Sequence, residues 1–194
     1  MSIEQIRSLF PVTKEAVYLN SASQCPLNTL VNDRLQDYLK TEVNPVGKKS
    51  FDRRNIRVLL SRLLGGAPEE YALVTSTGVG LGIVAQGLNL KAGDNIVVPE
   101  REHWNNSFPW LQLQEKGVKV RFAKVNEDNS IDPKAIGKLI DDKTRVVAIA
   151  AVRFNSGFRP NLAAIGKIAH EKNALFVVDA AQGAGMVPIN VEED

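Results

Sequence analysis

The chain has 194 residues, 44% hydrophobic and 24% charged, which is the ordinary balance of a soluble globular protein. Twenty-four Lys and Arg against 22 Asp and Glu leave a formal net charge of +2, too small to indicate a nucleic-acid partner. One cysteine, Cys25, and two histidines, His103 and His170, exclude an internal disulfide and a cysteine- or histidine-rich metal centre. No apolar run approaches the ~18 residues that span a bilayer, and no secretory signal begins the chain, so we expect no membrane partner and a cytoplasmic location.

The first 70 residues predict helices joined by turns. Apolar residues recur every three or four positions over residues 27–42 and again over residues 50–64. The sequence NPVG at 44–47 interrupts this pattern, and Gly65 and Gly66 end it. In the second helix we expect a set of inward-facing apolar side chains: Phe51, Ile56, Leu59, Leu60, Leu63 and Leu64. We therefore predict an N-terminal helical segment over residues 1–70.

Strands and helices alternate after residue 70. Short runs rich in Val, Ile and Ala predict five strands, at residues 71–75, 95–98, 118–123, 145–151 and 174–179. Helical patterns lie between them, at residues 78–88, 105–116, 132–140 and 160–172. This alternation predicts an α/β domain over residues 71–194, with a mostly parallel sheet flanked by helices. Because residues 146–152 and 175–178 are apolar on both faces, we expect them to be buried central strands.

Ligands of parallel sheets bind beyond the carboxyl ends of the strands, so the residues that follow each strand are the candidates for a site. Residues 75–82, with sequence TSTGVGLG, follow the first predicted strand and enter a helix. Such a helix start offers free N–H groups and a favourable dipole to a phosphate. An N-cap followed by glycines for tight packing explains the same residues equally well.

Aromatic and charged residues follow the next two strands in the same way. His103, Trp104 and Trp110 come after the strand at 95–98 and could offer a stacking surface to a flat ligand, although a surface histidine that caps a helix is the commoner situation. Arg153 and Arg159 follow the strand at 145–151 and could bind a carboxylate or phosphate, although solvated loop arginines are commoner.

An acid ends the last predicted strand. Asp179 directly follows an apolar run, so it is expected to be partly buried and to need a metal, a ribose hydroxyl or a protonated ring nitrogen as its partner. The small residues that follow it, AAQGAG at 180–185, allow a flat ligand to approach the backbone.

Taken together, these segments resemble the class V aminotransferase and cysteine desulfurase family, pyridoxal phosphate enzymes of fold-type I. The most specific segment is VVDAAQGAGMVPINV at residues 177–191. It is joined by the block of Glu102, His103, Asn106, Pro109 and Trp110, and by residues 18–22 near the N-terminus. The resemblance implies that the chain is the N-terminal part of such an enzyme, a truncated large domain that binds pyridoxal 5'-phosphate.

The resemblance also implies roles for individual residues. Asp179 pairs with the protonated ring nitrogen, Gln182 bonds the phenolic oxygen, and His103 stacks on the ring and moves protons. Thr77 and Gly78 contact the phosphate. Asn20, Ser21 and Ala22 line the substrate side, where a small amino acid binds. A homodimer is implied for the full-length form.

Three departures separate the chain from desulfurases. The turn at residues 153–157 reads RFNSG where desulfurases have Ser-Asn-Val-X-Gly, so Phe154 replaces an Asn that touches the ring oxygen. The mobile desulfurase cysteine and the Schiff-base lysine both belong beyond residue 194. We therefore expect a portion of a desulfurase-, epimerase- or lyase-like enzyme that lacks this lysine. The alternative is a truncated product or pseudoenzyme that binds a phosphorylated ligand or a partner chain without catalysis.

Overall fold

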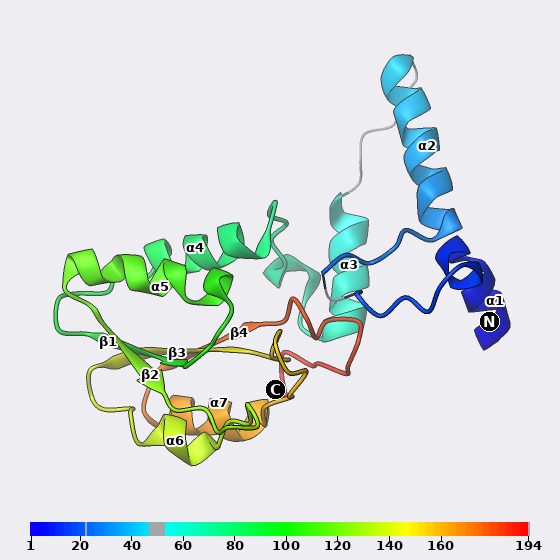
Figure 1. The fold of residues 1–194 in the computed structure, drawn as a ribbon. Coiled ribbons are helices and arrows are strands. Elements are labelled where there is room, and N and C mark those ends of the chain that lie inside the picture. The colour runs from blue at the N-terminus through cyan, green and yellow to red at the C-terminus, as the bar shows by residue number, and fades with distance from the viewer. Residues whose placement is uncertain (22, 47–52, 194) are drawn as a thin grey trace. The chain divides into compact units, whose positions relative to one another are not determined.

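The computed structural model describes residues 1–21, 23–46 and 53–193, and the chain divides into two compact units, Met1–Asp52 and Arg53–Asp194. The first unit contains α1 (Ile3–Ser8), the 3-10 helix η1 (Pro11–Lys14) and α2 (Thr29–Val43) (Figure 1). The backbone N–H of Thr29 donates to the carbonyl of Leu9 at 2.9 Å, which ties the start of α2 to the segment that follows α1.

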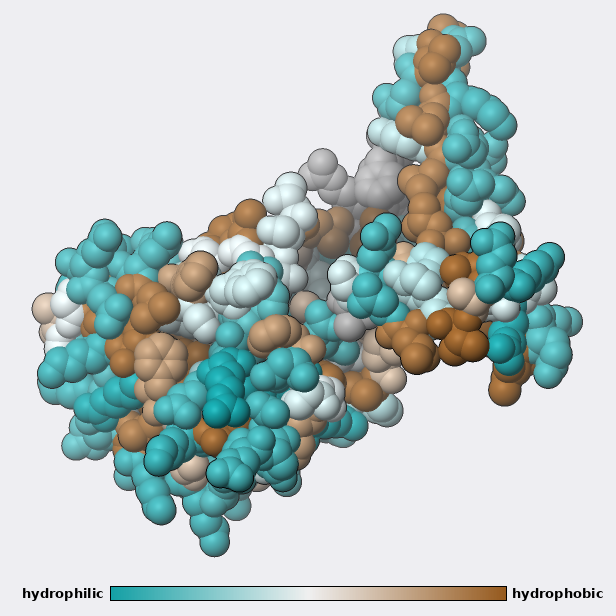
Figure 2. Space-filling view, in the orientation of Figure 1, coloured by the Kyte–Doolittle hydropathy of each residue, from teal (hydrophilic) through white to brown (hydrophobic). Residues whose placement is uncertain are grey.

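Helix α2 carries an exposed apolar stripe. The helix begins where the side chain of Asn28 accepts the N–H of Val31 at 2.9 Å, a regular N-cap. Its apolar residues share one face, as the spacing predicted, and they run along the helix as the brown stripe of Figure 2. The stripe consists of Leu30, Val31, Leu35, Tyr38 and Leu39, which are 41–57% exposed.

The second unit is an α/β domain built on one sheet. Its helices and strands, in chain order, are α3 (Arg53–Leu64), η2 (Pro68–Glu70), α4 (Thr77–Gly87), β1 (Asn95–Pro99), η3 (Trp104–Asn106), α5 (Phe108–Leu111), η4 (Gln112–Lys116), β2 (Lys119–Ala123), α6 (Pro133–Gly137), β3 (Thr144–Ala150), α7 (Leu162–Glu171) and β4 (Leu175–Asp179). The strands lie in the order β2-β1-β3-β4, and every neighbouring pair is parallel. The predicted α/β fold with a parallel sheet is confirmed.

Two helical layers cover the sheet, α4 and α5 on one face and α6 and α7 on the other (Figure 1). Successive side chains of a strand point to opposite faces, so β1 contributes to both layers. Ile96 packs in a buried cluster with Trp110 of α5, whereas Val97 packs in a second cluster with Ile165 of α7. Both clusters lie inside this unit, and they hold the carboxyl ends of the strands in fixed positions.

Three sequence predictions about elements were wrong in detail, and one could not be compared. Residues 71–75 do not form a strand, because within the described residues no neighbouring strand pairs with them, and Leu73 and Val74 are exposed. The helix predicted at 105–116 is divided into η3, α5 and η4, since Pro109 lacks the N–H that a continuous helix needs. In α3, Leu59 and Leu63 are exposed rather than inward. Phe51 lies outside the described residues.

The two strands that were predicted to be central differ in their positions. β3 lies between β1 and β4, and its residues from Val146 to Ala150 are buried, as predicted. β4 has one neighbour among the described residues, and Leu175 is exposed while Phe176 and Val178 are half-buried. The expectation that residues 175–178 are central was wrong for the sheet as described.

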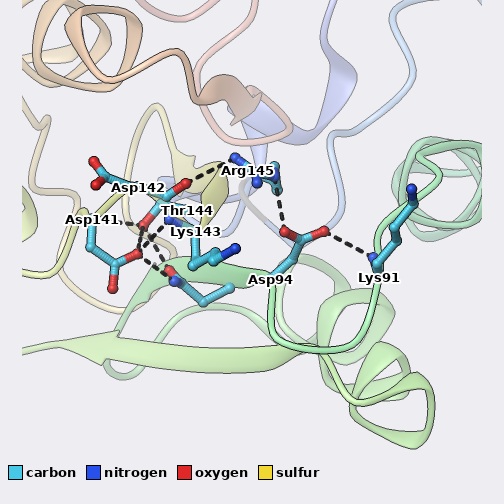
Figure 3. A network of polar contacts seen from close by, with 8 residues as sticks. Lys91, Asp94, Asp141, Asp142, Lys143, Thr144 and Arg145 are labelled. Carbon is cyan, nitrogen blue, oxygen red and sulfur yellow. Dashed lines mark hydrogen bonds and ion pairs between the residues drawn. The ribbon is translucent and has the colours of Figure 1, made fainter.

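A polar network joins the amino ends of β1 and β3, at the opposite edge of the sheet from the site (Figure 3). Asp94 Oδ1 accepts from Arg145 Nε at 3.0 Å, and Asn95 Nδ2 donates to Asp141 Oδ1 at 2.8 Å. The hydroxyl of Thr144, which is fully buried, donates to Asn95 Oδ1 at 2.7 Å. These bonds pair buried polar groups that would otherwise destabilise the sheet.

Asp141 is expected to make the stability of this unit sensitive to acid. Its hydrogen bond from Asn95, together with the Lys143 N–H and Arg121, holds the pKa of the Asp141 carboxyl well below its usual range. A pKa lowered on folding stabilises the protein above the unfolded value of about 3.9, and this contribution is lost as the pH falls toward the folded value.

Asp141→Asn is therefore expected to lower the unfolding free energy at pH 7, and the difference from the unaltered chain should shrink below pH 4. Urea unfolding at pH 7 and pH 3 measures it. Asp142→Asn is the control, because Asp142 joins the network through its backbone carbonyl, which accepts from Arg145. A difference that stays constant between the two pH values would contradict the prediction.

Candidate functional site

A cavity of about 170 Å³ lies at the carboxyl ends of β1, β3 and β4 in the second unit. Its lining residues come from the last residues of β3 and β4 and from the segments that follow the three strands: His103, Asn105, Ala150, Val152, Phe154, Asp179, Ala181 and Gln182. The sequence placed His103, Asp179 and Gln182 in one site, and the structure brings all three to this cavity. This is the edge of a parallel sheet at which ligands bind.

His103 both caps a helix and lines the cavity. Its Nδ1 accepts the backbone N–H of Asn105 at 3.2 Å at the start of η3, which assigns the hydrogen of a neutral imidazole to Nε2. The ring lies 5.0 Å from that of Phe154 in an edge-on arrangement, and 4.9 Å from that of Trp104. His103 can therefore cap the helix and face a ligand at the same time, since the hydrogen bond that caps the helix also orients the ring on the cavity wall.

Asp179 supplies a buried carboxylate. It is the last residue of β4, it is 6% exposed, and its Oδ1 accepts the N–H of Ala181 at 2.9 Å. That bond orients the side chain within the turn after β4. A buried carboxylate on a cavity wall is an acceptor for a protonated nitrogen, because both groups lose their hydration together.

The start of α4 has both features that the sequence left open as alternatives, a regular N-cap and free N–H groups that could bind a phosphate. Ser76 is the N-cap and accepts the N–H of Val79 at 3.2 Å, while the first helical bond runs from Gly80 N to Ser76 O. The N–H groups of Thr77 and Gly78 precede that bond and point out of the helix end, where they favour an anion. A Cβ on Gly78 would lie 3.3 Å from Asn105 Oδ1, so glycine allows this cavity residue to approach the helix start.

Glu102 ties two strands together behind His103. One carboxylate oxygen accepts the N–H of His103 and the other accepts the N–H of Ala150, both at 2.9 Å. Since β1 ends at Pro99, this carboxylate takes the N–H of β3 that β1 no longer reaches. Burial raises the pKa of Glu102, opposed by these two hydrogen bonds and by the charge of Arg153.

Arg153 is buried, so the expectation of a solvated loop arginine was wrong. It is 1% exposed, and its Nη2 donates to the carbonyls of Glu100 and Arg101, each at 2.9 Å. Burial lowers the pKa of its guanidinium. Arg159, in contrast, is exposed and donates to the carbonyl of Pro188.

The three residues predicted to line the substrate side belong to the first unit. The carbonyl of Asn20 accepts the N–H groups of Ser23 and Gln24 in a turn, and Ser21 is exposed in that turn. Ala22 lies outside the described residues. Their substrate role stays a prediction.

Two residues of the site or its support were given no role from the sequence, Glu102 and Asn105, and the supporting role of Arg153 was not predicted. Glu102 and Asn105 flank His103 in a turn after a strand, a position that already signals a site. Arg153 and Phe154 were expected near the site, Arg153 as a ligand-binding or solvated arginine and Phe154 where desulfurases have an Asn. They enter a turn, closed by the Gly157 N–H on the Arg153 carbonyl at 2.9 Å, in which no regular spacing indicates which side chain faces the cavity and which is buried.

Known proteins match the chain over nearly its whole length. A model of the family described as "Aminotransferase class-V" matches residues 17–193. A probable cysteine desulfurase of Methanothermobacter thermautotrophicus is 32% identical over 98% of this chain and 50% of its own length. A cysteine desulfurase of Shigella sonnei is 28% identical over 98% of this chain and 52% of its own. The chain spans about half the length of the curated relatives it matches.

Solved structures agree with this assignment. The apo structure of a cysteine desulfurase from Thermococcus onnurineus NA1 has a TM-score of 0.88 at 26% identity, covering 100% of this chain and 51% of that one. A cysteine desulfurase from Escherichia coli has a TM-score of 0.86 at 27% identity, covering 99% and 52%. Because the family model spans residues 17–193 and the site lies at the strand ends inside that range, the chain belongs to the aminotransferase class-V family.

Proposed function

We propose that the chain is the N-terminal portion of a pyridoxal-phosphate-dependent enzyme that acts on small amino acids. The observation that carries this proposal is the cavity that places His103 and the buried Asp179 together at the carboxyl ends of parallel strands. The start of α4 beside Asn105 adds N–H groups for an anion. The names of the cysteine desulfurase relatives support an amino-acid substrate.

The residues present fit this cofactor. Asp179 would accept a hydrogen bond from the protonated ring nitrogen, and His103 would lie against the ring and move a proton at Nε2. Gln182 would bond the phenolic oxygen, while Thr77 and Gly78 would hold the phosphate through their N–H groups. When bound, pyridoxal phosphate supplies a sink for the electron pair left as a bond at the substrate α-carbon breaks.

The reaction class we propose is desulfurase-, epimerase- or lyase-like chemistry. Phe154 lies on the cavity wall, and its ring meets that of His103 in an edge-on arrangement, so this position offers a hydrocarbon side chain where desulfurases have a hydrogen-bonding Asn. Among the described residues no helix is both long and apolar enough to cross a membrane. Our proposal includes a cytoplasmic homodimer that binds neither nucleic acid nor membrane.

Titration of the purified chain with pyridoxal phosphate, followed by tryptophan fluorescence, tests the proposal, since Trp104 adjoins His103. We expect saturable binding that His103→Ala weakens by up to about tenfold, because ring contacts contribute roughly 0.5–1.5 kcal/mol. His170→Ala is the matched control, since His170 is exposed on α7. Equal affinities for both variants would contradict the assigned site.

Comparing ligands tests the phosphate contacts and the alternative function. Pyridoxal without the phosphate is expected to bind more weakly than pyridoxal phosphate, because the start of α4 then has no anion to hold. In the complete enzyme, cofactor binding without conversion of cysteine or any other small amino acid would favour the alternative of a binding protein without catalysis.

A further inference from the structure

The guanidinium of Arg153 is buried with few partners. Its Nη2 donates to two backbone carbonyls, but Nε and Nη1 are buried and have no hydrogen-bond partner among the described residues. Burying a charged group with unsatisfied donors costs free energy of folding. The two hydrogen bonds of Nη2 offset part of this cost and hold the two carbonyls in place.

Those two bonds span a residue in an unfavourable backbone conformation. Arg101 has φ of 55°, in the left-handed region that non-glycine residues rarely adopt. The carbonyls that Nη2 holds are those of Glu100, just before it, and of Arg101 itself. One amino group therefore holds the chain on both sides of the left-handed residue, between the end of β1 and His103.

Glu102 stabilises the next residue of the same turn, His103. Its carboxylate accepts the N–H groups of His103 and Ala150, and the charge of Arg153 favours its ionised form. Residues 100–103 are thus bound to Ala150 at the end of β3 and to Arg153 in the segment that follows β3. The direction in which the His103 ring leaves this turn depends on both groups.

We propose that Arg153 and Glu102 are positioning residues that set the His103 imidazole on the cavity wall, Arg153 by holding the left-handed turn at Arg101 and Glu102 by holding the His103 N–H. The inference rests on the proposed function only in taking His103 as a ligand-facing group. Its test needs no cofactor, so a failure to bind pyridoxal phosphate would leave the test valid.

The imidazole nitrogens of His103 report the position directly. Long-range ¹H–¹⁵N spectra of the chain are recorded about two pH units above the ordinary histidine pKa of about 6.5, where the ring is neutral. The chain has two histidines, so His170→Gln assigns both sets of signals. In the unaltered chain we expect Nδ1 to appear as an acceptor and Nε2 as the protonated nitrogen, as the Asn105 bond requires.

Arg153→Met is expected to bring the two nitrogen shifts toward each other, as the ring loses its single tautomer, and to speed amide exchange at Ala150 at least tenfold. Arg159→Met is the matched control. Arg159 belongs to the same loop, and its guanidinium also donates to a backbone carbonyl, but it is exposed. It is expected to leave the His103 signals unchanged. Unchanged His103 signals in Arg153→Met, with only a loss of stability, would overturn the proposal.

A second substitution separates positioning from simple packing. Glycine adopts a φ of 55° without strain, so Arg101→Gly in the Arg153→Met background should restore much of the His103 tautomer pattern. Failure to restore it would assign Arg153 a merely structural role and refute the proposal. If Arg153→Met does not fold, Arg153→Lys takes its place, with a smaller change of the same sign expected; unchanged signals there would likewise refute it.

Discussion

Asp179→Asn is expected to retain the fold and to lose most of the affinity for pyridoxal phosphate, and most activity in the complete enzyme. Asparagine keeps the Oδ1 that accepts the Ala181 N–H, so the turn after β4 should be preserved. It loses the negative charge that a protonated ring nitrogen requires. Removing one partner of a buried charged pair costs about 2–5 kcal/mol, or roughly 30- to 4,000-fold in binding.

Equilibrium titration with pyridoxal phosphate measures the loss in this chain, and steady-state turnover measures it in the complete enzyme. Asp132→Asn is the matched control, because Asp132 caps α6 away from the cavity and asparagine caps a helix equally well. Affinity and turnover that stay within twofold in Asp179→Asn would remove Asp179 from the site.

Trp110→Ala is expected to cost about 3–5 kcal/mol of unfolding free energy, because it empties a large volume in the core. Trp110 is fully buried between α5 and the sheet, in the cluster with Ile96 and Val98. The same helix follows η3, so the loss should also loosen the segment that carries His103.

Urea unfolding monitored by circular dichroism measures this effect. The other tryptophan is a natural control, since Trp104 is 60% exposed and Trp104→Ala should cost about 1 kcal/mol or less. Similar losses in the two variants would show that the core cluster does not stabilise the unit as its burial implies.

The sequence predicted that His103, Asp179 and Gln182 lie in one site, because each signal was local. Asp179 ends an apolar run, and His103 follows another in a turn that begins a helix, so both lie at carboxyl ends of strands as soon as the strands are parallel. Parallel pairing followed in turn from the alternation of strands and helices, which is local as well.

Strand formation and burial that depend on a neighbouring strand could not be predicted from the sequence. The run at residues 71–75 has the composition of a strand, yet it has no partner among the described residues and stays irregular. The run at residues 175–178 is apolar on both faces, yet it lies at the edge of the described sheet. Strand formation and burial both require another segment, and its identity is not written in the run itself.

The sequence by itself determined the α/β fold class, the sheet edge that carries the site and the residue types offered there, because periodicity and strand-end position are properties of short segments. Only the tertiary structure decided that Phe154 faces the cavity while Arg153 turns inward to hold the carbonyls on either side of a left-handed residue. The physical reason is that Arg153 and Phe154 enter a turn, closed by the Gly157 N–H on the Arg153 carbonyl at 2.9 Å, in which no regular spacing sets the direction of a side chain. The side chain that faces the cavity is determined by contacts with segments far away in the chain. The hydrogen bond from Arg153 to the carbonyl of Glu100, 53 residues earlier, is an example.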